Sequence, residues 1–457
     1  MSIYHSLLKP DLQQMLVESD NVGMSEFCDV LHAAVTAEVL EGFETTEILD
    51  VLRSCELLKQ VEILEFLPLP LQLSLVEELE RTDRKRLSRW LEEMSSDDRV
   101  DLLSRLSEKQ VEGLLPLIAQ AERNDIRKLL SFPEESAGAI MTTEYALLPE
   151  QITVKEALGK LRKQAPDRET IYYVYVIDDG RHLLGFVSLR DLILANPETT
   201  LTELMKRDVI SVRVDDDQEF VAGELQKYNF IAIPVVDNQN RLVGIVTHDD
   251  AMDVLEEEAT EDAHMAGAVA PLEDSYLETP LFTLLHKRGV WLAVLSSAAV
   301  ATAAMLQQYE TVSESYTWMI LFLPLVLASG GNAGSQSATL IIRFLAVDDQ
   351  HTQSTHLRLA RRELIMGLTL GTFLAVIGFS FGWMFVGKLE GVVVAVTVAM
   401  VVTLGTCSGA MLPILFRKFG MDPALMSNPL IAALVDILGV VIYYSVAILI
   451  LGRVEAG

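Results

Sequence analysis

Long apolar runs fill the C-terminal part of the chain, whereas residues 1–285 carry shorter amphipathic blocks. A helix needs about 20 mostly apolar residues to cross the hydrocarbon layer of a membrane. By this hydropathy criterion five segments are candidates: 289–307, 316–346 with a polar interruption, 364–386, 392–416 and 429–451. The pattern therefore predicts a five-helix transmembrane domain over residues 288–457.

Basic residues mark one side of these spans. Lys287 and Arg288 precede the first span, arginines cluster within 343–362, and Arg417 and Lys418 follow the fourth span. The alternating loops, 307–316 and 387–391, hold one positive charge between them. The positive-inside rule then predicts a cytoplasmic N-terminal half and an outside C-terminus in a bacterial inner membrane. The N-terminus lacks a basic region followed by an apolar stretch, so no secretory signal is expected.

Two polar features interrupt the spans. The segment 329–339, SGGNAGSQSAT, places Asn332, Gln336 and two adjacent glycines at membrane depth. Small residues permit tight helix packing, but buried amides are costly unless they line water or a pore. Asp436 in the fifth span either pairs with an Arg or Lys or faces an ion pathway. We interpret both features as parts of a pore, and Pro413 and Asn428-Pro429 as breaks or ordinary kinks and caps.

Residues from about 25 to 131 repeat apolar positions at spacings of three and four, with polar turns between the blocks. This periodicity predicts an all-α, superhelical N-terminal domain over 1–131. Such a domain serves as a protein-binding arm or as a sensor, and its composition does not choose between them.

Residues 138–262 contain an internal repeat of roughly 60 residues. YVYVIDDGRHLLGFVSLRDLI in the first copy is answered by IAIPVVDNQNRLVGIVTHDDAM in the second. Each copy predicts a helix, two strands joined by a turn, and a closing helix. This resembles a tandem CBS-domain pair, with copies over 132–200 and 201–262. The resemblance implies either a dimerising scaffold or an adenine-nucleotide site such as one for ATP, whose candidate residues are Tyr173, Arg190, Asp191 and Phe230.

The charge is concentrated in the same half. Residues 1–285 carry 26 Lys and Arg against 56 Asp and Glu, which excludes nucleic acid as a partner and favours cations. Cys28, Cys55 and Cys407 lack metal-binding spacing and are interpreted as small apolar residues. An acidic run lies on adjacent faces of one helix and is either a solvated face or a site for Mg²⁺, which prefers oxygen ligands: Asp250, Asp253, Glu257, Glu258, Glu261 and Asp262.

The whole order of segments resembles the MgtE family of magnesium channels. The resemblance rests on GGNAGSQSATLIIRFLA, LGTCSGAMLPILFRKFGMDPAL and SNPLIAALVDILG in the membrane part, after the helical domain, CBS pair and acidic connecting segment. It implies a homodimer in membrane lipid, with residues 263–287 as a connecting plug helix. The sequence departs from the common pattern at Ala433, where threonine is frequent, and at Phe344, where a small residue often follows the arginine.

The resemblance also assigns residues. It implies that Asp436 holds hydrated Mg²⁺ in the pore, with Asn428 and Ala432 nearby. The acids of the connecting helix and the second CBS copy would face Asp97 and Asp101 when the channel closes.

The expected function is magnesium uptake driven by the membrane potential and gated by cytosolic Mg²⁺. The chain carries no P-loop, HExxH or GxSxG motif, so no enzymatic reaction is expected. Two alternatives stay open: a membrane-anchored nucleotide sensor of the CBS type, and a transporter of Co²⁺ or Mn²⁺, because oxygen-rich sites accept each of these ions.

Overall fold

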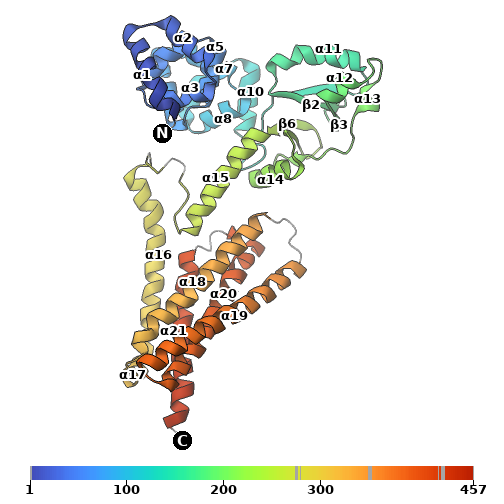
Figure 1. Ribbon diagram of the computed structural model, residues 1–457. Helices are drawn as coiled ribbons and strands as arrows, with labels where there is room; N and C mark the ends of the chain where they lie inside the picture. The colour runs from blue at the N-terminus through green and yellow to red at the C-terminus, as the bar shows by residue number, and fades with distance from the viewer. Residues whose placement is uncertain are drawn as a thin grey trace. The chain divides into compact units, whose positions relative to one another are not determined.

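The computed structural model describes residues 3–272, 276–277, 279–347, 353–419, 421–423 and 428–455. The chain forms two compact units, Met1–Leu255 and Glu256–Gly457. In Figure 1 the first unit is coloured from blue to green and the second from yellow to red.

Short helices form the first part of the first unit. They are α1 Ile3–Glu18, α2 Asn21–Val30, α3 Ala33–Leu40, α4 Thr45–Ser54, α5 Leu57–Glu65, α6 Leu69–Thr82, α7 Arg84–Glu93, α8 Ser96–Ser104, α9 Glu108–Leu114, η1 Leu115–Leu117 and α10 Gln120–Leu129. Asp20 and Asp83 cap α2 and α7 by accepting bonds from backbone N–H groups in the first turn. From α1 to α5, each helix packs against the helix two places further along. This packing buries one apolar core, which includes Trp90.

Two copies of one α/β motif follow. The first contains β1 Tyr145–Pro149, α11 Val154–Gln164, η2 Ala165–Asp167, β2 Thr170–Ile177, β3 Leu183–Ser188 and α12 Leu189–Leu194. The second contains α13 Leu201–Leu204, β4 Val212–Arg213, α14 Gln218–Tyr228, β5 Ala232–Val236, β6 Leu242–Thr247 and α15 His248–Ala266. Each copy has a three-stranded sheet, in which the first strand pairs parallel and the last antiparallel to the middle one. The predicted internal repeat is confirmed.

The hairpin turns of the two copies share their chemistry. Asp178 Oδ1 accepts bonds from the backbone N–H groups of Gly180 and His182, and Asp237 Oδ1 does the same for Gln239 and Arg241. Aspartate favours such turns because its short side chain bonds its own backbone. An antiparallel bridge between His182 and Arg241 joins the two turns, so the copies lie back to back.

The second unit is built of long helices. They are α16 Leu281–Gln308, the short α17 Glu310–Ser315, α18 Met319–Val347, α19 Gln353–Phe385, α20 Lys388–Lys418 and α21 Asn428–Glu455. Close packing joins α18 to α20 and α21, and α19 to α20 (Figure 1). Glycines on α19 permit the second contact, because Gly371 lies against the backbone of Ala399.

Four helices within the described residues are long and apolar enough to cross a membrane: Leu281–Gln308, Thr355–Phe385, Lys388–Lys418 and Asn428–Gly452. The expected number was five; the segment 316–346 is not among these four, and the fifth span stays a prediction. That segment does form the long helix α18, but its amide and small residues between 329 and 339 lower its hydropathy. The proline interruptions are mild: α20 continues through Pro413, and Pro429 lies in the first turn of α21, where proline is tolerated.

The connecting segment differs from the single helix expected over 263–287. Residues 263–266 end α15, and residues 281–287 begin α16. Between them Ala268 has a φ of 57°, next to Gly267, and Pro271 and Pro280 lack the N–H that would continue a helix. The Lys287 ammonium donates to the carbonyl of Pro271 and holds this turn against α16.

Candidate functional site

The polar segment 329–339 of α18 packs on the start of α21. Ser335 Oγ donates to the backbone carbonyl of Asn428 over 3.2 Å, and Thr339 Oγ1 donates to its side-chain Oδ1 over 3.3 Å. Further along, a Cβ built on Gly331 would lie 3.2 Å from Ala432 Cβ and 3.9 Å from Asp436 Oδ1. Positions four apart share one face of a helix. Asn428, Ala432 and Asp436 therefore form one stripe of α21 beside the polar segment.

Asp436 is half-buried and makes no ion pair with a Lys, Arg or His that the structure describes. A carboxylate inside a membrane helix is costly without a partner, so such groups usually meet an ion or a water-filled path. Asn332 and Gln336 lie on the neighbouring, exposed face of α18, and among the described residues neither makes a hydrogen bond. The structure thus places these two amides on an exposed face of α18, next to the face that bonds α21.

The glycines of the same segment pack against α20. A Cβ on Gly334 would lie 3.1 Å from the carbonyl oxygen of Gly405, and one on Gly409 would overlap the carbonyl oxygen of Gly334. The backbones of α18 and α20 are therefore in contact. Tight packing and exposed polar side chains are both features of this helix, on different faces.

A second group of acids lies in the first unit, where the N-terminal helices meet the α/β repeat. Asp97 on α8 is 9% exposed, and its Oδ1 has no hydrogen-bond partner among the described residues. Ser96, its neighbour, bonds Thr142 and Thr143 at the entrance to the first α/β copy. The acids whose charges interact here form what we call the acid cluster: Glu65, Asp97, Asp98, Glu144, Glu169, Asp249, Asp250 and Asp253.

Burial and mutual repulsion change the titration of the acid cluster. Burial, and then the Asp98 charge, raises the pKa of Asp97 to about 6 and that of Glu65 to about 8. Burial, and then the Asp97 charge, raises the pKa of Asp250 to about 7 and that of Glu169 to about 8. The folded protein therefore holds protons here that an unfolded chain would release.

One arginine partly offsets these charges. Arg99 Nη2 lies 3.8 Å from Glu144 Oε1, and Arg99 Nη1 donates to the carbonyl of Leu91. Throughout the described residues, no three His, Cys, Asp or Glu side chains are already close enough to coordinate one metal ion. The acid cluster is thus a partly buried region of excess negative charge rather than a preformed cage among the described residues.

The other predicted acids divide between the two units. Asp101 and Asp253 are exposed residues of the first unit. The negative charge of Asp253 helps to raise the pKa of Asp98. Glu257, Glu258, Glu261 and Asp262 belong to the second unit. There burial and the Asp422 carboxylate raise the pKa of Asp262, while Arg343 opposes this.

Aromatic side chains gather on the first sheet. Tyr173 on β2 contacts Phe186 and Phe230 edge to face, with ring centroids 5.5 and 6.5 Å apart. The Lys206 ammonium lies 5.7 Å from the centre of the Phe186 ring and 4.0 Å from Asp191 Oδ2. Arg190, next to Asp191, is exposed. Aromatic faces, two cations and one carboxylate suit a ligand with a planar base and phosphates.

The repeat places different charges at the equivalent positions of the second copy. Ser188 accepts a bond from the N–H of Asp191, and Thr247 Oγ1 donates to Asp250 Oδ2 over 2.5 Å, at the same point of each motif. Arg190 in the first copy corresponds to Asp249 in the second. The aromatic site and the acid cluster are therefore related by the internal repeat, with an arginine in one and an aspartate at the equivalent position of the other.

The chain is also similar to known proteins over most of its length. The magnesium transporter MgtE of Thermus thermophilus is 43% identical over 370 residues, which cover 79% of this chain and 80% of that protein. The chain belongs to the MgtE family. The MgtE transporters of Enterococcus faecalis and Bacillus subtilis are 38% and 35% identical and cover 71% and 81% of the chain, with the same shares of their own lengths.

Family models match each part of this MgtE-family chain. The model described as the MgtE divalent cation transporter matches residues 323–446, the MgtE intracellular N domain matches 31–135, and the CBS domain matches 137–198 and 201–257. The soluble part of a magnesium transporter aligns with 56% of the chain and 99% of its own, at 33% identity and a TM-score of 0.52. The cytosolic domain of the Mg²⁺ channel MgtE in complex with ATP covers 54% of the chain and 100% of its own, at 38% identity and a TM-score of 0.51.

Sequence reasoning missed several residues of these sites in the MgtE-family chain. Glu65, Glu144 and Glu169 lie far apart in the sequence, and only the fold brings them to Asp97 and Asp250. Phe186 and Lys206 complete the aromatic site. The alternation along β3 places Phe186 on the same face as its cross-strand partner Tyr175, a signal that the sequence did contain.

Proposed function

We propose that the chain moves Mg²⁺ across a membrane along a path past Asp436. The observation that carries this is the α21 stripe, which presents a half-buried carboxylate without a described basic partner beside the polar segment of α18. Its MgtE-family relatives are named magnesium transporters and span most of the chain. Mg²⁺ gives up its water reluctantly, so one carboxylate, with amide and backbone oxygens around it, suits an ion that stays hydrated.

The membrane potential is sufficient to drive uptake. Moving one charge through 100 mV is worth about 2.3 kcal/mol, so a dication gains about 4.6 kcal/mol, enough for accumulation on the order of 10³-fold. An open channel would overload the cell, and a sensor is therefore required.

Ion uptake by purified protein tests the transport proposal. The chain in liposomes with an imposed potential should carry Mg²⁺, and expression should rescue a strain whose growth depends on added Mg²⁺. The same liposomes are given Co²⁺ and Mn²⁺. Faster uptake of either ion than of Mg²⁺, with no rescue, would favour the alternative transporter.

We infer that the membrane domain uses α18 as a fifth span. Its 29 residues are long enough to cross a membrane, and Ser335 and Thr339 on its polar side bond Asn428 of α21. With the loop charges this puts the soluble half in the cytoplasm and the C-terminus outside an inner membrane.

We infer that cytosolic Mg²⁺ closes the channel by binding two groups of acids. The first is the acid cluster, which joins the superhelical N-terminal domain to the CBS pair, with Asp101 at its edge. The second lies on α15, just before the connecting segment 263–287 that we assign as the plug: Glu257, Glu258, Glu261 and Asp262. A dication converts repulsion among carboxylates into attachment, so the domains lock at high Mg²⁺ and separate at low Mg²⁺.

Paired neutralisation tests the plug. Glu258→Gln with Glu261→Gln should leave channels open at Mg²⁺ concentrations that close the wild type in patch recordings. Glu310→Gln, an exposed acid on α17, is the control. Normal closure of the double variant would remove these residues from the sensor.

Two further parts complete the proposal. An adenine nucleotide such as ATP binds at Tyr173, Arg190, Asp191 and Phe230.

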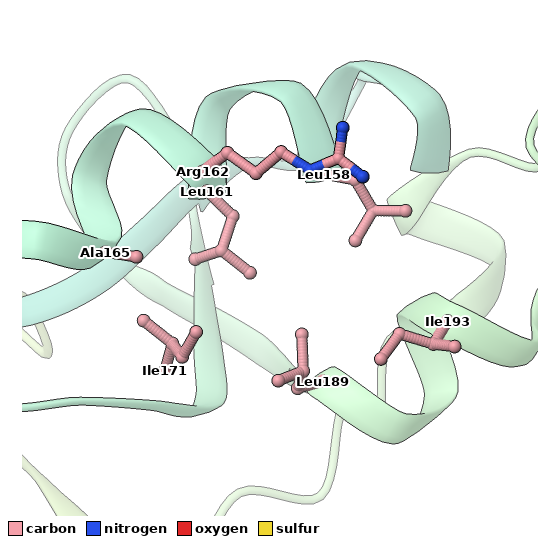
Figure 2. A pocket seen from close by; sticks show the side chains of 7 residues that line it. All are labelled: Leu158, Leu161, Arg162, Ala165, Ile171, Leu189 and Ile193. Carbon is pink, nitrogen blue, oxygen red and sulfur yellow. The ribbon is translucent and has the colours of Figure 1, made fainter.

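The chain forms a homodimer through the apolar faces of the CBS pair, where the residues lining a pocket converge from α11 and α12 (Figure 2). Ile193 is 65% exposed there, and the repeat gives the second copy a matching exposed Met252, at 60%. A two-fold axis would bring these exposed apolar side chains of two copies together and bury them. Ile193→Asp should yield monomers in size-exclusion chromatography with light scattering.

A further inference from the structure

A second carboxylate lies near the start of a candidate membrane helix, apart from Asp436. Glu363 is on α19, within the candidate span Thr355–Phe385, and is half-buried. Its Oε2 accepts a hydrogen bond of 2.6 Å from Ser337 Oγ, and Ser337 is 3% exposed. Within the described ranges no Lys, Arg or His pairs with Glu363. Glu363 thus bonds a buried side chain of α18 rather than one of the exposed arginines that precede it on α19.

Glu363 lies where three helices meet. One turn further along α19, Gly367 packs on Thr403 and Thr406 of α20. Ser337 belongs to α18. It follows Gly334, which contacts α20, and directly precedes Ala338, which is buried. A charge-assisted bond at such a junction is strong and directional.

The geometry of α18 shows what this bond holds. Ser335 and Thr339 bond Asn428 on α21, and Ser337 is midway between them in sequence. Two residues correspond to about 200° around a helix. Ser337 therefore points away from α21, and α18 is held by hydrogen bonds on nearly opposite sides.

We propose that Glu363 is a positioning residue of the ion path, which fixes the rotation of α18 through Ser337 and thereby sets the approach of Gly331 to Asp436. The inference rests on the proposed Mg²⁺ transport for its functional readout. Gly331 and Asp436 are close enough that a small rotation of α18 would change the width of the path there. Glycine contacts with α20 allow α18 to slide or turn, because they carry no side chain that interlocks.

The identity of the acceptor distinguishes positioning from ion binding. Glutamine keeps a carbonyl oxygen that can accept the Ser337 bond, whereas alanine keeps none. A positioning role therefore survives Glu363→Gln and fails in Glu363→Ala. A role as an ion ligand through charge fails in both.

The test compares Glu363→Ala, Glu363→Gln, Ser337→Ala and the double alanine variant in liposomes. We expect maximal Mg²⁺ flux to fall about tenfold in both single alanine variants, the factor that loss of a hydrogen bond to a charged group brings. The half-saturating Mg²⁺ concentration should stay unchanged, Glu363→Gln should be close to wild type, and Ser337→Ala should add nothing in the Glu363→Ala background. Wild-type flux in both alanine variants, or a Glu363→Gln as slow as Glu363→Ala, overturns the proposal.

A second measurement does not depend on transport. Backbone amides over 329–339 should exchange with deuterium faster in detergent-solubilised Glu363→Ala and Ser337→Ala than in wild type, with Glu363→Gln unchanged. Unchanged exchange in both alanine variants contradicts the positioning role even if the chain carries no Mg²⁺. If Glu363→Ala fails to fold, Ser337→Ala alone decides both readouts.

Discussion

Removing one charge from the acid cluster should stabilise the protein when Mg²⁺ is absent. Asp97 is buried, and its pKa rises from the ordinary 3.8 to about 6. Each pKa unit corresponds to about 1.4 kcal/mol, so the charged form costs the fold about 3 kcal/mol. Asp97→Asn keeps the size and removes the charge. Without Mg²⁺ at about pH 8 it should raise the free energy of unfolding of the soluble half by up to about 3 kcal/mol.

The sign of the pH dependence follows from the direction of these shifts. A carboxyl whose folded pKa is raised holds a proton in the folded state that the unfolded state has lost, so stability falls as pH rises from about 4 to 8. The gain from Asp97→Asn should therefore shrink towards about pH 5, where the wild-type carboxyl is protonated. Mg²⁺ should stabilise the wild type at high pH, because it replaces those protons, and should stabilise Asp97→Asn less.

Thermal unfolding of the full-length protein in detergent, followed by circular dichroism, measures this effect. The melts are recorded at low and high pH, each with chelator and with excess Mg²⁺. Asp208→Asn, an exposed aspartate of the same half, is the matched control and should change little. The reasoning is refuted if Asp97→Asn is no more stable than wild type at high pH without Mg²⁺, or if Mg²⁺ stabilises both equally.

Two further changes test other parts of the structure. Tyr173→Ala should weaken ATP binding about tenfold in calorimetry, since stacking on an aromatic ring is worth about 1–3 kcal/mol; the 60% exposed Tyr172 supplies the control Tyr172→Ala, and equal losses in both would count against the site. Gly409→Ala should separate α18 from α20, because its Cβ would overlap the Gly334 carbonyl, and so lower both Mg²⁺ flux and thermal stability. Gly289→Ala on α16, where a Cβ meets nothing within 4 Å, should be neutral, and a neutral Gly409→Ala would show that the two helices are not in backbone contact.

The sequence predicted what local pattern determines. The turns with Asp178 and Asp237, each followed by an apolar strand, identified the repeat because such turns are short-range chemistry. The stripe of Asn428, Ala432 and Asp436 followed from a family motif, and helical spacing places it on one face. Hydropathy predicted the span around Asn332 less clearly than the others. The polar residues through which α18 bonds α21 also lower its hydropathy.

The sequence pattern did not predict contacts between residues that lie far apart in the chain. Glu65 ends α5, Glu169 precedes β2 and Asp250 begins α15, so only folding brings their charges together. The bond between Ser337 and Glu363 depends in the same way on how α18 and α19 pack. Gly334 was open to two interpretations, and its distance to the Gly405 carbonyl decides for helix packing at that position.

The most direct test of the claim that Mg²⁺ passes Asp436 is Mg²⁺ influx through the Asp436→Asn variant. Asparagine preserves the volume and one oxygen but removes the charge, and the helix is unchanged. In liposomes with an inside-negative potential, Mg²⁺ influx should fall to the level of empty liposomes, while Glu310→Gln stays at wild-type rate. Influx through Asp436→Asn at the wild-type rate would mean that ions do not pass this carboxylate.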